Sequence, residues 1–262
     1  MRILIIGEGK SGTTALLRSV SAALDDPVES FEPVSIEASD LEPDVLVVKK
    51  LLLNWKRPEA ELLPRFDKRI WIVRDPRDRL ISHLLYDAYN QAPSLNAKKR
   101  ARWVDAVRAK AENPSGVPFL EVTRAWWDIS GVDLLSHYVR AVDRARRFAR
   151  RPGAEFFVVK YEDYVEQNFT ALEEYLGLTL ATGVVRKNET RVARSGSHSE
   201  WRRWMTPEDL RVFQPLSNDW LRTHGYDHKD WQLEPVDQFD PTTTYEYVQS
   251  LFERRPINPE SS

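Results

Sequence analysis

The chain contains no cysteine among its 262 residues. This absence excludes disulfide bonds, thiolate metal sites and cysteine nucleophiles. No apolar stretch approaches the ~20 residues that a membrane-spanning helix needs. The first strand is expected to begin at residue 2, which leaves no room for a signal peptide or an anchor. We therefore expect a cytoplasmic protein without a membrane span.

An excess of charge of either sign is missing as well. Lys and Arg number 38 and Asp and Glu number 40, which gives a formal net charge of −2. Broad nucleic-acid binding needs many uncompensated cations, so this balance argues against nucleic-acid partners. With 42% hydrophobic and 30% charged residues, the composition is that of a globular protein. The sequence leaves a homodimer open.

The length suits one large domain over residues 1–262. Its core is expected at about 1–231. Residues 232–262 read as a C-terminal extension with one short helix, because four prolines interrupt that segment.

Strand and helix patterns alternate along the chain. Apolar runs without in–out alternation, typical of strands buried on both faces, lie at 2–6, 45–48, 70–73 and 156–159. Helical patterns follow at about 13–24, 77–90, 97–112, 131–150, 165–176, 206–224 and 242–253. The alternation predicts an α/β fold with a central parallel sheet and helices on both faces. Ligands bind beyond the carboxyl ends of such strands, where Lys10, Lys49, Arg74 and Tyr161 are expected.

The segment Gly7-Glu8-Gly9-Lys10-Ser11-Gly12-Thr13-Thr14 joins the first strand to the first helix. A strand that breaks at glycines and reopens as a helix directs several backbone N–H groups to one place, at the positive end of the helix dipole. Lys10 adds a full charge, and Ser11, Thr13 and Thr14 add hydroxyl donors. The segment therefore predicts a cradle for a phosphate-like group. In an NTPase P-loop the lysine follows the last glycine, whereas Lys10 precedes Gly12, so no metal position is implied.

A second motif begins at Arg74, the tip of a predicted strand, and Asp75-Pro76 then starts a helix. Helical spacing from Asp75 brings Arg79 and Ser82 onto one face. Arg74 and Ser82 are therefore predicted to flank a single pocket.

Two further segments complete the set of motifs. Arg194-Ser195-Gly196 is followed by Trp201, seven residues after the arginine, and Lys160-Tyr161-Glu162-Asp163 follows the last predicted strand. Together the motifs resemble those of the sulfotransferase superfamily that uses 3′-phosphoadenosine 5′-phosphosulfate (PAPS). The resemblance runs from residue 3 to about residue 204, in the family's order. Ser195 stands where a lysine is common, which removes one charge.

The resemblance implies a PAPS site without a metal. The residues expected to bind this cofactor are Gly9, Lys10, Ser11, Gly12, Thr13, Thr14, Arg74, Ser82, Tyr161, Arg194, Ser195 and Gly196. The first six would hold the 5′-phosphosulfate. Arg74, Ser82 and the segment 194–196 would hold the 3′-phosphate. In-line sulfuryl transfer builds negative charge on the departing phosphate oxygen, which Lys10 would stabilise.

The general base departs from the family pattern. Cytosolic members carry Lys-Thr-His after the second conserved strand, whereas this chain has Val48-Lys49-Lys50-Leu51 and lacks the histidine. Glu32, in Phe31-Glu32-Pro33, resembles a glutamate of carbohydrate and bacterial members and is our predicted base, with Glu29 and His83 as alternatives. Lys49 is predicted to stabilise the transferred sulfuryl group, and Lys50 replaces it if the register differs by one.

The acceptor is expected to be a hydroxyl of a carbohydrate or another small molecule. Residues 87–130 contain Trp103, Trp126, Trp127 and the Pro/Gly-bearing loop 113–118. These tryptophans either line the acceptor pocket or anchor helices to the core, and the loop is a candidate lid.

Arginine-rich stretches at 98–102 and 140–151 either attract an anionic acceptor or form solvated helix faces. Two other functions stay open at this point. One is a Mg²⁺-dependent P-loop kinase, which the order of the loop residues disfavours. The other is a non-catalytic protein that binds PAPS or its desulfated product, adenosine 3′,5′-bisphosphate (PAP), as the missing histidine suggests.

Overall fold

The computed structural model describes residues 1–150, 155–181 and 198–255. The chain divides into two compact units, and each is described by itself. The first consists of Met1–Arg74 and Asp143–Glu189, and the second of Asp75–Val142 and Thr190–Ser262. The expectation of one domain over the whole chain stays a prediction.

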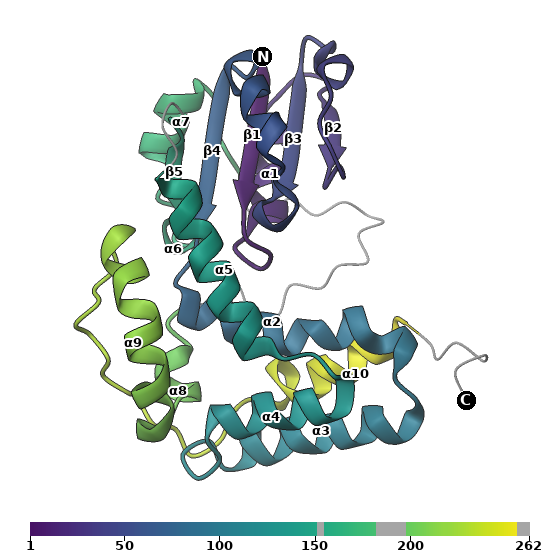
Figure 1. Ribbon diagram of the computed structural model, residues 1–262, viewed down its shortest axis with the longest axis vertical. Coiled ribbons are helices and arrows are strands. Elements are labelled where there is room, and N and C mark those ends of the chain that lie inside the picture. The colour runs from purple at the N-terminus through teal and green to yellow at the C-terminus, as the bar shows by residue number, and fades with distance from the viewer. Residues whose placement is uncertain (151–154, 182–197, 256–262) are drawn as a thin grey trace. The chain divides into compact units, whose positions relative to one another are not determined.

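The first unit contains a five-stranded parallel sheet (Figure 1). The strand order is β2-β3-β1-β4-β5. The bounds are β1 Arg2–Gly7, β2 Val28–Phe31, β3 Leu46–Leu51, β4 Lys68–Val73 and β5 Phe157–Lys160. All four strands expected from apolar runs are present, and the predicted α/β class with a parallel sheet is confirmed. Because the strands are parallel, their carboxyl ends share one edge.

Helices cover both faces of this sheet. One face packs on α1 (Thr13–Ala22), α6 (Tyr161–Val165) and α7 (Thr170–Leu176). The other packs beneath the 3₁₀-helices η1 (Ala38–Leu41) and η3 (Arg57–Arg65). On that second face Phe148, near the end of α5 (Leu134–Ala149), lies edge-on to Trp71 at 5.3 Å between ring centroids. The sheet is therefore buried on both sides, which explains the unbroken apolar runs of its inner strands.

The fifth strand, β2, did not appear among the expected strands. Its sequence Val-Glu-Ser-Phe has no apolar run, and its residues are exposed or half-buried at the edge of the sheet. The helix expected at 165–176 begins only at Thr170, as α7, because the preceding helix α6 ends at Val165. The break falls at Gln167, whose φ of 63° is incompatible with a right-handed helix.

The second unit is helical in its described part. Its α-helices are α2 (Pro76–Gln91), α3 (Ala97–Glu112), α4 (Phe119–Ser130), α8 (Trp201–Trp204), α9 (Pro207–Thr223) and α10 (Tyr245–Glu253), and the first part of α5, residues 134–142, also belongs to it. The second unit also contains the short 3₁₀-helices η4 (Ala92–Ser94) and η5 (Pro241–Thr243). A further 3₁₀-helix, η2 (Leu52–Asn54), belongs to the first unit. The helix α10, expected in the C-terminal extension, packs on α2 and α3. That segment therefore contributes to the core of this unit.

The tryptophans of the 87–130 stretch divide between core and surface. Trp103 and Trp126 are fully buried, with ring centroids 4.6 Å apart. Trp127 is 52% exposed. The loop 113–118 is tied to α3, since the ammonium of Lys110 donates to the carbonyls of Pro114 and Val117, both at 2.6 Å. Trp103 and Trp126 therefore anchor helices to the core, which is one of the two interpretations given above for these tryptophans.

No helix within residues 1–150, 155–181 and 198–255 combines the length and apolar character that crossing a membrane requires.

Candidate functional site

The loop between β1 and α1 depends on two of its glycines. A Cβ at Gly7 would lie 2.7 Å from the carbonyl oxygen of Ile72 and from the hydroxyl of Ser11. Gly12 has φ +90°, and a Cβ there would lie 2.5 Å from the ring of Tyr161. Inside the loop, Ser11 donates to the carbonyl of Glu8 through its N–H at 3.2 Å and its hydroxyl at 2.7 Å. The chain can therefore turn tightly here only without side chains at positions 7 and 12.

The helix α1 begins directly from this loop. Gly12 occupies its N-cap position, so no side chain caps the helix there, and its first turn contains no acidic residue. Thr13 and Thr14 are the first two helical residues. The positive end of the helix dipole therefore faces the loop with no carboxylate of that turn to offset it. An anion is the ligand that such an arrangement favours.

Two residues from other strands lie against the loop. Arg74, directly after β4, donates from Nη1 to the carbonyl of Lys10 at 3.2 Å. Its guanidinium also stacks on the ring of Tyr161, 4.2 Å from the centroid. Tyr161 follows β5 and closes against Gly12. The first unit thus gathers Lys10, Gly12, Arg74 and Tyr161 at the carboxyl edge of the sheet.

The predicted base and its lysine form an ion pair at the same edge. The ammonium of Lys49 contacts the carboxylate of Glu32, and the N–H of Glu32 donates to the carbonyl of Lys49 at 2.8 Å. The Lys49 side chain is 1% exposed and that of Glu32 is 23% exposed. Phe31 covers the ammonium, at 4.3 Å from its ring centroid. An adjacent cation favours the ionised form of a carboxylate, which is the form that accepts a proton.

The alternates to this pair have other partners. Lys50 is fully buried and contacts the carboxylate of Glu59, which also accepts the N–H of Ile36 at 3.0 Å. Adjacent residues of a strand point to opposite faces, so Lys49 and Lys50 have separate surroundings. Glu29, the substitute base, contacts the guanidinium of Arg18.

A further ion pair was missed in the sequence. Glu8, within the loop, accepts hydrogen bonds from Arg144 of α5, with Nε to Oε1 at 2.9 Å and Nη2 to Oε2 at 2.7 Å. Arg144 belongs to the arginine-rich stretch 140–151, but no local pattern tells which arginine of a helix faces the loop. Among its neighbours, Arg146 pairs with Asp143 in an exposed i, i+3 contact. In the other stretch, Arg100 donates to three backbone carbonyls. Arg100 therefore has a structural role, since it links the start of α3 to the backbone of other segments.

Ser82 lies on α2 in the second unit and is buried. Asp75 caps this helix, accepting the N–H of Arg77 at 2.9 Å, as the Asp-Pro start predicted. His83, next to Ser82, is half-buried. The joint action of Ser82 with Arg74 on a 3′-phosphate stays a prediction.

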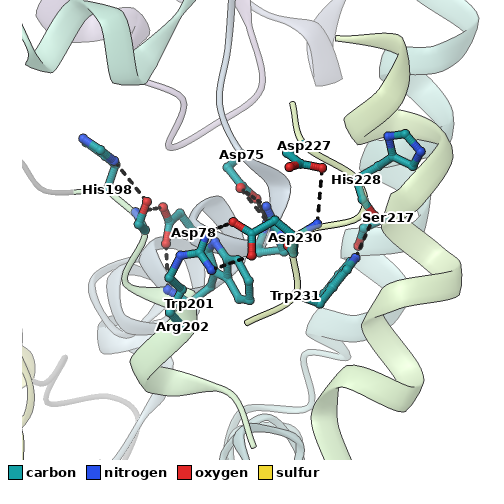
Figure 2. Close-up of polar contacts among 12 residues, drawn as sticks. Asp75, Asp78, His198, Trp201, Arg202, Ser217, Asp227, His228, Asp230 and Trp231 are labelled. Carbon is teal, nitrogen blue, oxygen red and sulfur yellow. Dashed lines mark hydrogen bonds and ion pairs between the residues drawn. The ribbon is translucent and has the colours of Figure 1, made fainter. Parts of the chain in front are cut away.

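The N-terminal turn of α2 is the anchor for the segment 198–204. The carboxylate of Asp78 accepts the N–H groups of Ser199 at 2.5 Å and Trp201 at 2.9 Å, as Figure 2 shows. The guanidinium of Arg77 stacks on the rings of Trp201, at 3.8 Å, and Trp231, at 4.7 Å. The predicted phosphate-binding residues Arg194, Ser195 and Gly196 precede this anchor and lie outside the described residues.

An ion pair also holds the segment 198–204. Arg202 contacts both carboxylate oxygens of Asp230 (Figure 2). The hydrogen bond from Arg202 lowers the pKa of Asp230 to about 2. Asp230 therefore stays ionised, and the pair stays formed, across the physiological pH range. Within the described residues, His, Asp and Glu side chains form no group of three that could hold a metal ion.

Comparisons with known proteins support the fold. No family model matches the chain, and no curated protein matches it in sequence. Among solved structures, it is similar to mouse sulfotransferase SULT7A1 complexed with PAP, with a TM-score of 0.52 and 17% identity over 84% of each chain. The chain therefore shares the fold of that sulfotransferase, which is the fold that the motifs predicted.

Proposed function

We propose that the protein is a sulfotransferase that moves the sulfuryl group of PAPS to a hydroxyl of a carbohydrate or another small molecule. The observation that carries the proposal is the meeting of Lys10, Arg74 and Tyr161 around a glycine-dependent loop at the carboxyl edge of the sheet. This arrangement occurs in a fold shared with a sulfotransferase that binds PAP.

The residues fit a nucleotide with phosphate groups at two positions. Among residues 1–150, 155–181 and 198–255, no atom lies within 4 Å of a Cβ built at Gly9, which suits the approach of a ligand to the loop. Lys10, the α1 N-terminus and the hydroxyls of Thr13 and Thr14 are suitable donors for the 5′-phosphosulfate. Arg74 is assigned to the 3′-phosphate, together with Ser82, Arg194, Ser195 and Gly196. These assignments are part of the proposal.

The chemical roles follow from the charges at the edge. PAPS supplies an activated sulfuryl group on a phosphate oxygen. Lys10 and the N–H groups of the loop stabilise the negative charge that develops on that oxygen. Glu32 accepts the proton of the acceptor hydroxyl. Lys49 contacts the Glu32 carboxylate and is assigned to stabilise the sulfuryl group in transfer. The transfer is in line and uses no metal ion.

Nucleotide selectivity tests the proposal. We expect PAP to raise the melting temperature by several degrees, because a ligand that binds only the folded state stabilises it by about 2.7 kcal/mol at 100 times its Kd. AMP, which lacks only the 3′-phosphate, should raise it less. The Arg74→Ala variant should lose the difference between PAP and AMP. Arg69→Ala, at the opposite end of β4, should keep it.

The outcome also separates the alternatives. A larger shift with ATP·Mg²⁺ than with PAP would favour the kinase and contradict the proposal. Radiolabelled PAPS offered with a panel of sugars, phenols and alcohols then tests for transfer. A PAP shift without any labelled product across the panel would favour the non-catalytic binding protein.

A further inference from the structure

A carboxylate stands inside the loop that the proposed function assigns to an anion. Glu8 lies between Gly7 and Gly9, two residues before Lys10, so its Cα is within about 7.6 Å of the Cα of Lys10. Its side chain is 11% exposed, so water screens it poorly. A negative charge in this position repels a phosphate, and its presence in the loop needs an explanation.

The contact between Glu8 and Arg144 explains why a carboxylate can stand in this loop. Arg144 contacts both oxygens of the Glu8 carboxylate, in the bidentate geometry for which a guanidinium is suited. The two residues are 136 positions apart in the chain, so the pair is made by the fold. The carbonyl of Glu8 meanwhile accepts both donors of Ser11 inside the loop. Arg144 therefore neutralises the side chain of a residue whose backbone shapes the loop.

We propose that Arg144 is a positioning residue that neutralises and holds the Glu8 carboxylate so that the loop can bind an anionic ligand. This inference rests on the proposed function, in which that ligand is the 5′-phosphosulfate of PAPS. Without the arginine, one full negative charge would remain unpaired in the loop that holds the phosphate. For a separation of about 8 Å and an effective dielectric constant of about 20, that repulsion corresponds to a loss of affinity of about tenfold or more.

Calorimetric titration of PAP into wild type, Arg144→Gln, Glu8→Gln and the double variant tests the inference. Arg144→Gln should bind PAP about tenfold more weakly or worse, because the carboxylate is left without its partner. The double variant should recover to within about threefold of wild type, since carboxylate and guanidinium are then both absent. If the ion pair only stabilised the structure of the loop, the double variant would bind PAP as weakly as Arg144→Gln does. That result would contradict the inference.

Three controls keep the result interpretable. Glu8→Gln alone should bind PAP at least as tightly as wild type, and weaker binding would contradict the inference even if Arg144→Gln did not fold. Arg146→Gln removes the same charge two residues along α5, from an exposed pair with Asp143, and should change affinity by less than about twofold. The deficit of Arg144→Gln should shrink in about 1 M salt, where the Debye length is about 3 Å.

The wild-type titration separates this inference from the proposed function. If wild type binds PAP and Arg144→Gln binds equally well, the inference fails and the proposed function stands. If wild type does not bind PAP, the proposed function fails, and the same four proteins are titrated with inorganic sulfate. The order expected for PAP should then appear for sulfate. Absence of sulfate binding to wild type would overturn the inference as well.

Discussion

Neighbouring lysines of one strand have different roles in this protein. Lys49 contacts Glu32 at the edge where the proposed reaction takes place, whereas Lys50 contacts Glu59 beneath η3. Successive side chains of a β-strand point to opposite faces of the sheet, so the two lysines lie on different faces. Two Lys–Glu ion pairs therefore flank β3, one buried and one with a partly exposed carboxylate, and only the second is expected to take part in chemistry.

The Glu32→Gln variant tests that difference. We expect kcat for sulfuryl transfer to fall by about 10² to 10⁴, because the amide cannot accept the proton of the acceptor hydroxyl. The PAP-induced rise in melting temperature should be retained. Initial rates with labelled PAPS and an acceptor found in the panel provide the measurement.

The matched control is Glu59→Gln, which removes the carboxylate of the neighbouring pair. Its melting temperature should fall, because Lys50 is then buried without its counter-charge. Its kcat per folded molecule should stay near that of wild type. Equal losses of kcat in both variants would contradict the assignment of Glu32 as the base.

At this scale the sequence predicts most where neighbouring residues act together. The order of Lys10, Gly12 and Thr13 predicts the tight turn into α1, which the structure shows at Gly12, and their role in holding an anion stays a prediction. The partners of Glu8 and Glu29 could not be predicted in the same way. Arg144 reaches Glu8 from a distant helix, and Arg18 reaches Glu29 from α1. Only the fold determines which cations face which carboxylates.

At the scale of elements, one carboxylate connects two helices of the second unit. Asp209 is fully buried in the first turn of α9. It accepts the N–H groups of Phe119 and Leu120, both at 2.8 Å, at the start of α4, and the N–H of Thr206 at 2.7 Å. Donors at the starts of both helices are thereby satisfied by a single side chain.

Lys110, near the end of α3, gives a pH-dependent prediction at this scale. Burial lowers its pKa to about 8, and the charge of Asp209 opposes that shift. Between pH 8 and the ordinary lysine value of 10.5, the unfolded chain holds more protons than the folded chain. The free energy of unfolding contributed by Lys110 therefore rises with pH in this window.

Urea unfolding of wild type and Lys110→Met at several pH values measures this contribution. The difference between their free energies of unfolding should increase in favour of wild type from about pH 8 to pH 10.5, by at most about 1.4 kcal/mol per pH unit. It should be constant below that window. Lys98→Met, at an exposed position of the same helix, should show no such trend. A constant difference for Lys110→Met would show that its amine titrates normally.

The elements themselves were predictable to different degrees. Strands buried on both faces leave a continuous apolar signature, and the four expected ones were found. The edge strand β2 leaves none, because it has only four residues, two of them polar, and none of the four is buried. Helix α4 was missed although its buried residues Phe119, Val122, Trp126 and Ile129 recur at helical spacing, because the stretch 87–130 was interpreted for its tryptophans and its loop.

For the molecule as a whole, the balance of charge limits what it binds. PAP resembles a nucleotide of a nucleic acid, yet the chain carries a net charge of −2. We expect fluorescently labelled duplex DNA to show no anisotropy change at about 0.15 M salt, because counterion release needs many uncompensated cations. The positive control is PAP binding by the same preparation. DNA binding that PAP competes away would place the basic residues in a larger surface than one nucleotide site.

The sequence indicated the α/β class and the family fold because both depend on local order, in strands, loop and helices. It gave no sign of the two compact units into which the chain divides, and one domain over the whole chain stays a prediction. That division depends on which helices pack together across long chain separations. Composition and periodicity carry no such information.

The glycines of the loop differ in the room around them, and the difference has a practical use. Positions 7 and 12 exclude any side chain, whereas no atom of the described part of the chain lies within 4 Å of a Cβ built at position 9. A cysteine introduced at Gly9 would be the sole thiol of this chain. The rate at which this thiol is alkylated, compared with and without a ligand, would then report how far the ligand covers the loop. No native thiol would contribute to the measured rate.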